Sequence, residues 1–323
     1  MSSPDPLRPA APPAKLPVAV IVGPTAVGKT EASIQLARRM DGEIVSADSR
    51  LFYRGMDIGT AKPTREEMGD IPHHLIDVAD PDETWSLAMF QQAAQQAIAG
   101  IHSRGRLPII VGGTGQYIRA VTHGWSPPAA PPNEALRRAL ENLSAQYGLY
   151  WLHEKLRLLD PAAAASIDPR NVRRTIRALE VIFSTGRRFS DQRSQTDSPY
   201  RLLTLGLTRP RPELYARIDA RIEKMFADGL LDETRRLLER GYTPDLPAMS
   251  AIGYREAAAV LRGEMSLDEA IVQMKRLTRM FVRRQANWFK ENDPAITWFR
   301  AEPGVVEAMA AWLKQELTKP GIF

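Results

Sequence analysis

Short apolar runs alternate with helix-like patterns along the first part of the chain. Runs with the length and composition of buried strands lie at residues 18–22, 43–47, 74–78, 108–111 and 202–207. Two other stretches place apolar side chains at the spacing of one helix face. They are residues 31–39 and 86–102. This alternation predicts an α/β fold, a parallel sheet covered by helices on both faces.

The pattern changes at residue 126. Residues 126–132 are rich in proline and predict a rigid linker. From there to about residue 184 the chain reads as helical, with candidate helix starts at Asn133 and at Asp168-Pro169. We therefore predict an all-helical insertion domain at residues 126–198.

The rest of the chain returns to the first pattern. Residues 194–199 are turn-rich, the strand at 202–207 follows, and helices resume at Pro212. Ser266 and Glu269 form a capping box that opens a long helix. We expect one α/β core made of residues 17–125 and 199–323. Residues 1–16, rich in proline and alanine, predict a disordered tail without the apolar segment of a secretion signal.

Composition is that of an ordinary globular protein, with 44% hydrophobic and 25% charged residues in 323. No apolar run approaches the roughly 20 residues of a membrane helix, so we expect no membrane partner. The chain has no cysteine, which excludes disulfides and cysteine-ligated zinc and is compatible with the cytoplasm.

Positive charge is concentrated in two places. Ten arginines but only three acidic residues fall between Arg170 and Arg211. A second stretch, from Lys275 to Lys290, holds six basic residues and no acid. Single charge runs are usually solvated helix faces, but two such patches favour a polyanion such as nucleic acid.

A phosphate-binding loop follows the first predicted strand. The sequence fits G-x-x-x-x-G-K-T, between a buried strand and a helix, as this motif requires. Its residues are Gly23, Pro24, Thr25, Ala26, Val27, Gly28, Lys29 and Thr30. Backbone N–H groups and the helix N-terminus attract phosphate, Lys29 adds a full charge, and the Thr30 hydroxyl can reach Mg²⁺. The loop predicts a di- or triphosphate ligand.

Ligands of parallel sheets lie at the carboxyl ends of the strands, so Asp48 and Thr114 should lie in the same crevice as the loop. Position alone leaves three roles open for Asp48: general base, outer partner of a metal ion, or helix cap. The strand at 107–111 ends in Gly112-Gly113, where many phosphate-transferring enzymes carry a Mg²⁺-binding aspartate. This difference argues against a kinase.

Several longer motifs closely resemble the tRNA dimethylallyltransferases, also called tRNA isopentenyltransferases. Beyond the phosphate loop, the motifs are Ser-Ala-Asp-Ser-Arg-Leu-Phe-Tyr-Arg-Gly-Met-Asp-Ile-Gly-Thr-Ala-Lys-Pro (46–63), Pro-His-His-Leu-Ile-Asp (72–77), Val-Gly-Gly-Thr-Gly-Gln-Tyr (111–117), Arg-Ala-Leu-Glu-Val (177–181), Ala-Ile-Gly-Tyr-Arg-Glu (251–256) and Arg-Arg-Gln-Ala-Asn-Trp-Phe (283–289). The resemblance covers essentially everything after the tail. The segment 46–63 is more specific than the phosphate loop.

The resemblance implies transfer of a dimethylallyl group from dimethylallyl diphosphate to N6 of adenosine 37, beside the tRNA anticodon. It implies Mg²⁺ as cofactor, bound at Thr30, a P-loop core, and a monomer. The catalytic residues that it implies are Asp48, as general base, with Lys29, Thr25, Arg217 and Arg221. Arg217 and Arg221 are four residues apart on one predicted helix face and would clamp the diphosphate; otherwise they are a solvated face.

The resemblance also implies contacts with the tRNA anticodon stem-loop. The implied residues are Asp48, Ser49, Arg50, Leu51, Thr114, Arg137, Arg173, Arg174, Thr175, Ile176, Arg177, Ser250, Ala251, Ile252, Gly253, Tyr254, Arg255, Arg283, Arg284, Gln285, Ala286, Asn287, Trp288, Phe289 and Lys290. Tyr254, Trp288 and Phe289 could stack on bases, or could belong to the core.

Three other functions are compatible with parts of the sequence. A prenyltransferase acting on free AMP, ADP or ATP would not need the helical insertion or the basic helices. A nucleotide or small-molecule kinase would not explain Gly112-Gly113. A non-catalytic RNA-binding protein would leave the phosphate loop unexplained. His73 and His74 are adjacent on a predicted strand and point to opposite faces, so we expect hydrogen bonding from them and no shared metal.

Overall fold

The computed structural model describes residues 15–124, 128, 130–192 and 197–319. It divides into two compact units, one formed by Met1–Thr122 with Ser198–Phe323, the other by His123–Asp197. Nearly all of the tail expected at residues 1–16, and parts of the segments at 126–132 and 194–199, lie outside the described residues. No helix in the described part of the chain is long and apolar enough to cross a membrane.

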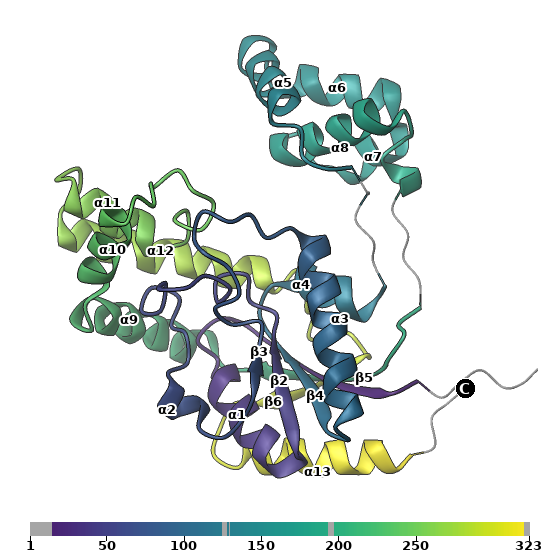
Figure 1. The fold of residues 1–323 in the computed structure, drawn as a ribbon, viewed down its shortest axis with the longest axis vertical. Helices are drawn as coiled ribbons and strands as arrows, with labels where there is room; N and C mark the ends of the chain where they lie inside the picture. The colour runs from purple at the N-terminus through teal and green to yellow at the C-terminus, as the bar shows by residue number, and fades with distance from the viewer. Residues whose placement is uncertain (1–14, 125–127, 129, 193–196, 320–323) are drawn as a thin grey trace, which may run out of the picture. The chain divides into compact units, whose positions relative to one another are not determined.

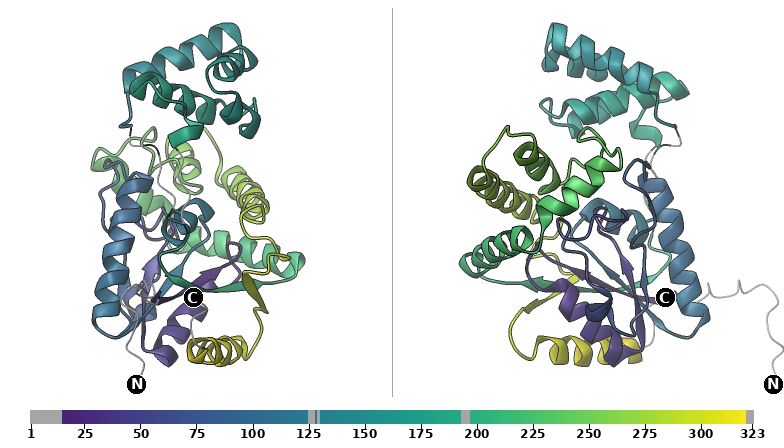
Figure 2. Two further views of the ribbon diagram at one scale, coloured as in Figure 1. Left: turned by 90° about the vertical axis from the view of Figure 1, so that its right-hand side faces the viewer. Right: turned by 60° about the vertical axis from the view of Figure 1, so that its left-hand side comes forward.

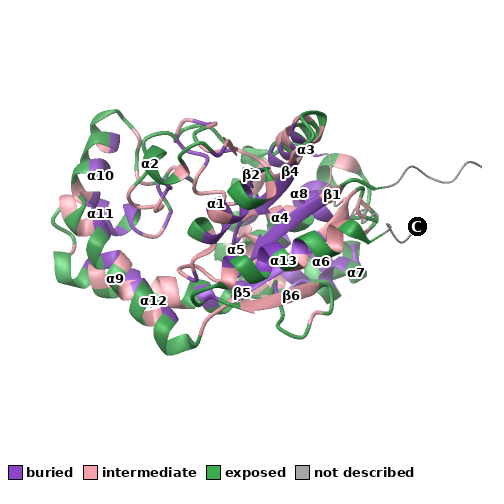
Figure 3. Ribbon diagram, turned by 90° about the horizontal axis from the view of Figure 1, so that it is seen from below, coloured by how far each residue is buried: buried purple, intermediate pink, exposed green. Residues whose placement is uncertain are grey.

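The larger unit is built on a parallel sheet of six strands in the order β3-β2-β4-β1-β5-β6. The strands are β1 (Pro17–Val22), β2 (Gly42–Ser46), β3 (His73–His74), β4 (Leu107–Val111), β5 (Arg201–Thr208) and β6 (Ile296–Arg300). The sheet carries the buried apolar runs of the sequence, and it forms the core of this unit (Figure 3). The predicted α/β class and parallel sheet are confirmed.

Helices cover both faces of this sheet, as right-handed crossovers require. The helices of the larger unit are α1 (Lys29–Met40), α2 (Arg65–Met68), α3 (Leu87–Ser103), α4 (Gly115–Thr122), α9 (Arg211–Ala227), α10 (Leu230–Glu239), α11 (Tyr254–Leu261), α12 (Leu267–Gln285) and α13 (Val305–Thr318). Helices α9 to α12 pack against one another. Helices α1 and α13 pack side by side on one face, and α3 packs against β2 and β4 on the other (Figures 1 and 2). Ser266 and Glu269 form the predicted capping box of α12.

Three details of the sequence prediction are wrong. The strand expected at 74–78 is only the two-residue β3, because Leu75 and Asp77 adopt positive φ angles (64° and 55°) that no strand accommodates. Strand β6 was missed. In the smaller unit, α8 begins at Val172 and is capped by Asn171, whereas the sequence placed a helix start at Asp168-Pro169.

The smaller unit is all-helical and has its own apolar core. It consists of α5 (Glu134–Tyr147), α6 (Leu149–Leu159), α7 (Pro161–Ser166), α8 (Val172–Thr185) and a short 3₁₀ turn, Ser190–Gln192. Asn133 caps α5 as predicted, accepting a hydrogen bond from the amide of Leu136. The buried carboxylate of Glu180 organises one side, because it accepts bonds from the amide of Asn133 and from Arg177 and lies within 3.0 Å of Arg137.

A buried carboxylate also stabilises the sheet near its edge strand β3. Glu43, on β2, accepts two hydrogen bonds from Arg104 and one from His74. These partners hold the pKa of Glu43 at about 2. His73 instead bonds the carbonyl of Ile71, so the two histidines serve separate structural contacts, as expected.

Candidate active site

The phosphate loop connects β1 to α1 and needs glycine at both ends. Gly28 has a φ of 110° and directly precedes the first residue of α1. Gly23 has a φ of 146°, and a Cβ there would lie 2.5 Å from the carbonyl oxygen of Leu207. The loop therefore packs against the end of β5, with its amides at the N-terminus of a helix, where anions bind.

Lys29 folds back over this loop. Its Nζ donates hydrogen bonds to the carbonyls of Gly23 (3.0 Å) and Pro24 (2.9 Å). Burial lowers its pKa to about 8, the negative charge of Asp48 opposes that shift, and the positive charge of Arg221 adds to it. Lys29, Asp48 and Arg221 thus lie within electrostatic reach of one another, although they come from α1, the end of β2 and α9.

Asp48 follows β2 at the carboxyl edge of the sheet and is half-buried. Its Oδ1 accepts a hydrogen bond from the amide of Arg50 (3.0 Å), a turn-capping contact. Its charge also acts on Arg221 and Tyr117. Asp48 therefore caps a turn and not a helix, because no helix begins between residues 47 and 64. This contact orients the carboxylate and leaves a role as a base open.

Arg217 and Arg221 lie one turn apart on α9 and both approach the loop region. Nε of Arg217 donates to the carbonyl of Ala26 (2.9 Å), within the phosphate loop. Arg221 donates to the carbonyl of Thr60 (3.2 Å), and burial lowers the pKa of its guanidinium. A merely solvated helix face is thus wrong for Arg221, whereas Arg217 is exposed although it bonds the phosphate loop. Arg221 lies within electrostatic reach of Lys29, Asp48 and Arg217.

Thr25 is held by a residue that the sequence assigned to RNA contact. The amide of Thr25 donates to Oε1 of Gln285 (2.8 Å), and Nε2 of Gln285 donates to the carbonyl of Gly113 (3.1 Å). The Gln285 side chain is buried, and a Cβ on Gly113 would lie 2.2 Å from its nitrogen. The side chain of Gln285 therefore joins the phosphate loop to the loop after β4 and is not exposed to RNA in this structure.

Thr30 is exposed in the first turn of α1, where its hydroxyl is free to face a bound diphosphate. Among the described residues, no group of three or more His, Cys, Asp or Glu side chains is arranged to hold a metal ion. A protein hydroxyl together with diphosphate oxygens and water is nevertheless a donor set that suits Mg²⁺, which seldom uses an all-protein cage. The residues present therefore fit the ion that the resemblance implies.

Several segments expected to face RNA lie near one another in the larger unit. Arg50 donates to the carbonyl of Pro247 (3.0 Å), which places residues 48–51 beside the segment that leads into 250–255. Gly115, next to Thr114, packs against the ring of Trp288, and Arg119 stacks on that ring (5.3 Å). Exposed members of these segments are Ser250, Arg255, Arg283, Arg284, Ala286, Asn287, Trp288 and Lys290.

Other members are core residues. Ala251, Tyr254 and Phe289 belong to the apolar core of the larger unit, and the Tyr254 hydroxyl donates to Glu233 (2.6 Å). Stacking of Tyr254 or Phe289 on a base is therefore wrong for the structure described, because neither ring is at the surface. Gly253 is buried as well, and Ile252 is half-buried.

Within the smaller unit, Arg173 and Arg174 are exposed near the start of α8, whereas Thr175 and Ile176 are buried. Arg137 and Arg177 are half-buried and paired with Glu180. Of the residues in the smaller unit that were expected to contact tRNA, only Arg173 and Arg174 expose their positive charge to solvent, as a contact with phosphate requires. The side chains of Thr175 and Ile176 face the core.

Two family models match this chain. One, described as IPP transferase, matches residues 51–292, and one described as isopentenyl transferase matches residues 16–78. The chain belongs to the IPP transferase family. Within that family it is 56% identical over 282 residues to a tRNA dimethylallyltransferase of Roseiflexus sp. strain RS-1, covering 87% of this chain and 92% of the relative.

Solved structures support the same family assignment. The tRNA isopentenylpyrophosphate transferase of Bacillus halodurans is 45% identical with a TM-score of 0.71, covering 94% of this chain and 97% of that one. A eukaryotic dimethylallyltransferase acting on tRNA is 27% identical with a TM-score of 0.78, covering 95% of this chain and 81% of that one. The resemblance seen in the sequence is thereby confirmed at the level of family and fold.

Proposed function

We propose that the protein transfers a dimethylallyl group from dimethylallyl diphosphate to N6 of adenosine 37 in the tRNA anticodon stem-loop and releases diphosphate. The main observation behind this proposal is that Lys29 of the phosphate loop, Asp48 and Arg221 lie close together at the carboxyl edge of the sheet. Membership of a family whose relatives are named tRNA dimethylallyltransferases supports the choice of donor and acceptor.

The reaction breaks the allylic C–O bond of the donor and forms a C–N bond at N6. The bonding electrons leave with the diphosphate, so negative charge grows on its oxygens as the bond breaks. The loop amides, Lys29, Arg217 and Arg221 can stabilise that charge. Thr25 contributes from within the loop, where Gln285 fixes its amide.

The N6 amine must lose a proton as it becomes attached to carbon. Asp48 is the acidic residue at this edge that acts electrostatically on both Lys29 and Arg221. We assign it as the base that accepts this proton, a role worth about 10²- to 10⁴-fold in rate. The amide of Arg50 holds one carboxylate oxygen, which leaves the other available to the amine.

The proposed cofactor is Mg²⁺. Thr30 and oxygens of the diphosphate would hold it, and when bound it supplies positive charge that neutralises the leaving group. The adenine must leave its stack to enter the crevice, a modest cost in a single-stranded loop. Exposed arginines of the smaller unit and of the segment 283–290 would bind tRNA phosphates. We propose that the protein works in the cytoplasm as a monomer.

The proposal is tested with purified protein, labelled dimethylallyl diphosphate and Mg²⁺, offered either unmodified tRNA or AMP. We expect label in tRNA. Label in AMP alone would contradict the proposal in favour of a nucleotide prenyltransferase.

A further inference from the structure

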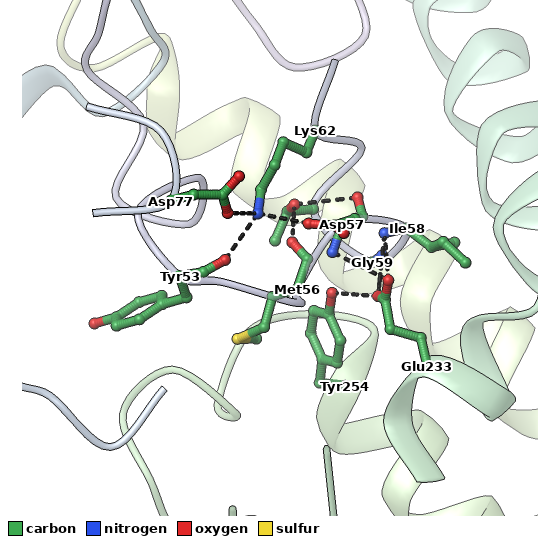
Figure 4. Close-up of polar contacts among 10 residues, drawn as sticks. Tyr53, Met56, Asp57, Ile58, Gly59, Lys62, Asp77, Glu233 and Tyr254 are labelled. Atoms are coloured by element: carbon green, nitrogen blue, oxygen red, sulfur yellow. Dashed lines mark hydrogen bonds and ion pairs between the residues drawn. The ribbon is translucent and has the colours of Figure 1, made fainter. Parts of the chain in front are cut away.

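Glu233, on α10, has a buried carboxylate that binds the backbone of a distant loop. Only 4% of the residue is exposed. Its two oxygens accept hydrogen bonds from the consecutive amides of Asp57, Ile58 and Gly59 at 2.9–3.2 Å, and Tyr254 donates its hydroxyl to Oε1 (Figure 4). Three amides and a hydroxyl compensate for removing this charge from water.

The loop that Glu233 holds is fixed from its other side as well. Lys62 is buried, and its Nζ donates to the carbonyl of Tyr53 (2.8 Å) and to the carboxylates of Asp57 and Asp77 (Figure 4). Gly59 lies flat against the Tyr254 ring, since a Cβ there would approach the ring within 2.6 Å. Residues 57–62 therefore have little freedom to move.

This loop contacts Arg221 of the candidate active site. Thr60, next to the amides that Glu233 binds, accepts a hydrogen bond from Nη2 of Arg221 (3.2 Å) through its carbonyl oxygen. The amide of Ala61, in the same peptide group as this carbonyl, donates to the carbonyl of Ile58 (3.0 Å), and this bond fixes the direction of the peptide. The direction of the Arg221 guanidinium consequently depends on where the loop is held.

We propose that Glu233 is a positioning residue for group transfer: by holding the backbone of residues 57–59, it aims the Thr60 carbonyl that orients Arg221 beside Asp48 and the phosphate loop. The inference rests on the proposed function. Glutamate suits this role because both of its oxygens accept from N–H groups. A glutamine would turn its own NH₂ toward the amides of Asp57 and Ile58 or of Ile58 and Gly59, and would repel them.

The test compares steady-state transfer to tRNA by the wild type, Glu233→Gln, Arg221→Ala and the double variant. Displacing a group in an active site can lower the reaction rate by up to about 10²-fold. We therefore expect Glu233→Gln to lower kcat by about 10- to 100-fold. The KM for tRNA should change by less than about twofold, because the residue is buried away from the surface. In the Arg221→Ala background, Glu233→Gln should have almost no further effect, since both act through the same guanidinium.

Glu43→Gln is the matched control, because it also neutralises a buried, multiply bonded glutamate of the same unit, and Glu43 lies at the amino end of β2. Its effect, per folded molecule, should be the same with and without Arg221. If Glu233→Gln keeps wild-type kcat, or lowers it by an equal factor in both backgrounds, the positioning role is wrong.

Two further measurements keep the test decisive. If thermal unfolding shows that Glu233→Gln does not fold, Tyr254→Phe replaces it, because this change removes only the hydroxyl that donates to Glu233. If the wild type transfers nothing to tRNA, the proposed function fails, and the same cycle is run on the affinity for inorganic diphosphate. Coupling between residues 233 and 221 in that affinity would support the positioning role, and strictly additive effects would overturn it.

Discussion

The side-chain oxygen of Gln285 accepts a hydrogen bond from the amide of Thr25, a residue 260 positions earlier in the chain (2.8 Å). The same side chain donates to the carbonyl of Gly113. The last residue of α12 thus sets the distance between the phosphate loop and the loop after β4.

Replacing Gln285 by leucine should loosen the phosphate loop. The change leaves the amide of Thr25 and the carbonyl of Gly113 without their partner, at about 1–3 kcal/mol for each group that stays buried. We expect a lower melting temperature and about tenfold weaker binding of dimethylallyl diphosphate, measured by calorimetry. Gln92→Leu, at an exposed position of α3, is the control and should leave both quantities unchanged. Unaltered diphosphate affinity in Gln285→Leu would show that the link is not needed for binding.

Asp48→Asn should separate chemistry from binding. Asparagine keeps an oxygen that can accept from the amide of Arg50, so the local turn should survive. It has no basic carboxylate, so kcat should fall by about 10²- to 10⁴-fold. Filter binding of tRNA should stay within about threefold of wild type, because removing the base leaves the phosphate contacts intact. A folded variant that has lost tRNA affinity would instead assign Asp48 to RNA binding.

The affinity for dimethylallyl diphosphate, measured without tRNA, should decrease as pH rises through about 8. Burial lowers the pKa of Lys29 to that value, so the free protein loses this positive charge above it. An anion binds the protonated form, and the dissociation constant should therefore rise by up to tenfold per pH unit above about 8. Lys29→Arg stays charged throughout and should give a flatter profile. Parallel profiles for the two proteins would remove Lys29 from the diphosphate site.

Arg173 and Arg174 should contribute to tRNA affinity in a salt-dependent way. Both are exposed on α8, and each phosphate contact that is lost should reduce the slope of log affinity against log salt by about 0.7–0.9. We expect the double alanine variant to bind tRNA more weakly and with a flatter slope. Lys314→Ala, which removes one exposed cation on α13, is the control for a loss of positive charge elsewhere and should leave the slope unchanged. An unchanged slope in the double variant would exclude Arg173 and Arg174 from the interface.

Arg177→Ala should instead lower the stability of the smaller unit, since Arg177 pairs with the buried Glu180.

Much of this architecture follows from local sequence. The phosphate loop, the strands at 18–22 and 202–207 and the capping box of α12 depend on neighbouring residues, whose spacing and residue types are visible along the chain. The strand β6 was missed because Ile296–Arg300 is a short edge strand, half-buried and preceded by polar residues, so its apolar pattern is weak. The strand expected at 74–78 was wrong because the backbone turns at Leu75 and Asp77. Neither residue is a glycine, so the sequence does not mark these turns.

From the sequence, site residues could be predicted only where they belong to a local motif. Gln285 and Glu233 act across the fold, on Thr25 and on residues 57–59, and each gains its role only when distant elements pack together. A lone glutamine at a helix end and a glutamate in the first turn of a helix are both ordinary surface patterns. Nothing in their own neighbourhoods distinguishes them, whereas Arg217 and Arg221 could be paired by their four-residue spacing.

Transfer to adenosine 37 is tested most directly with two synthetic anticodon stem-loops that differ only at position 37, one with adenosine and one with guanosine. Each is incubated with the protein, dimethylallyl diphosphate and Mg²⁺, then digested to nucleosides and analysed by mass spectrometry. We expect N6-dimethylallyladenosine from the first stem-loop and no modified nucleoside from the second. Equal modification of both, or modification only of free adenine nucleotide added to the same reaction, would contradict this expectation.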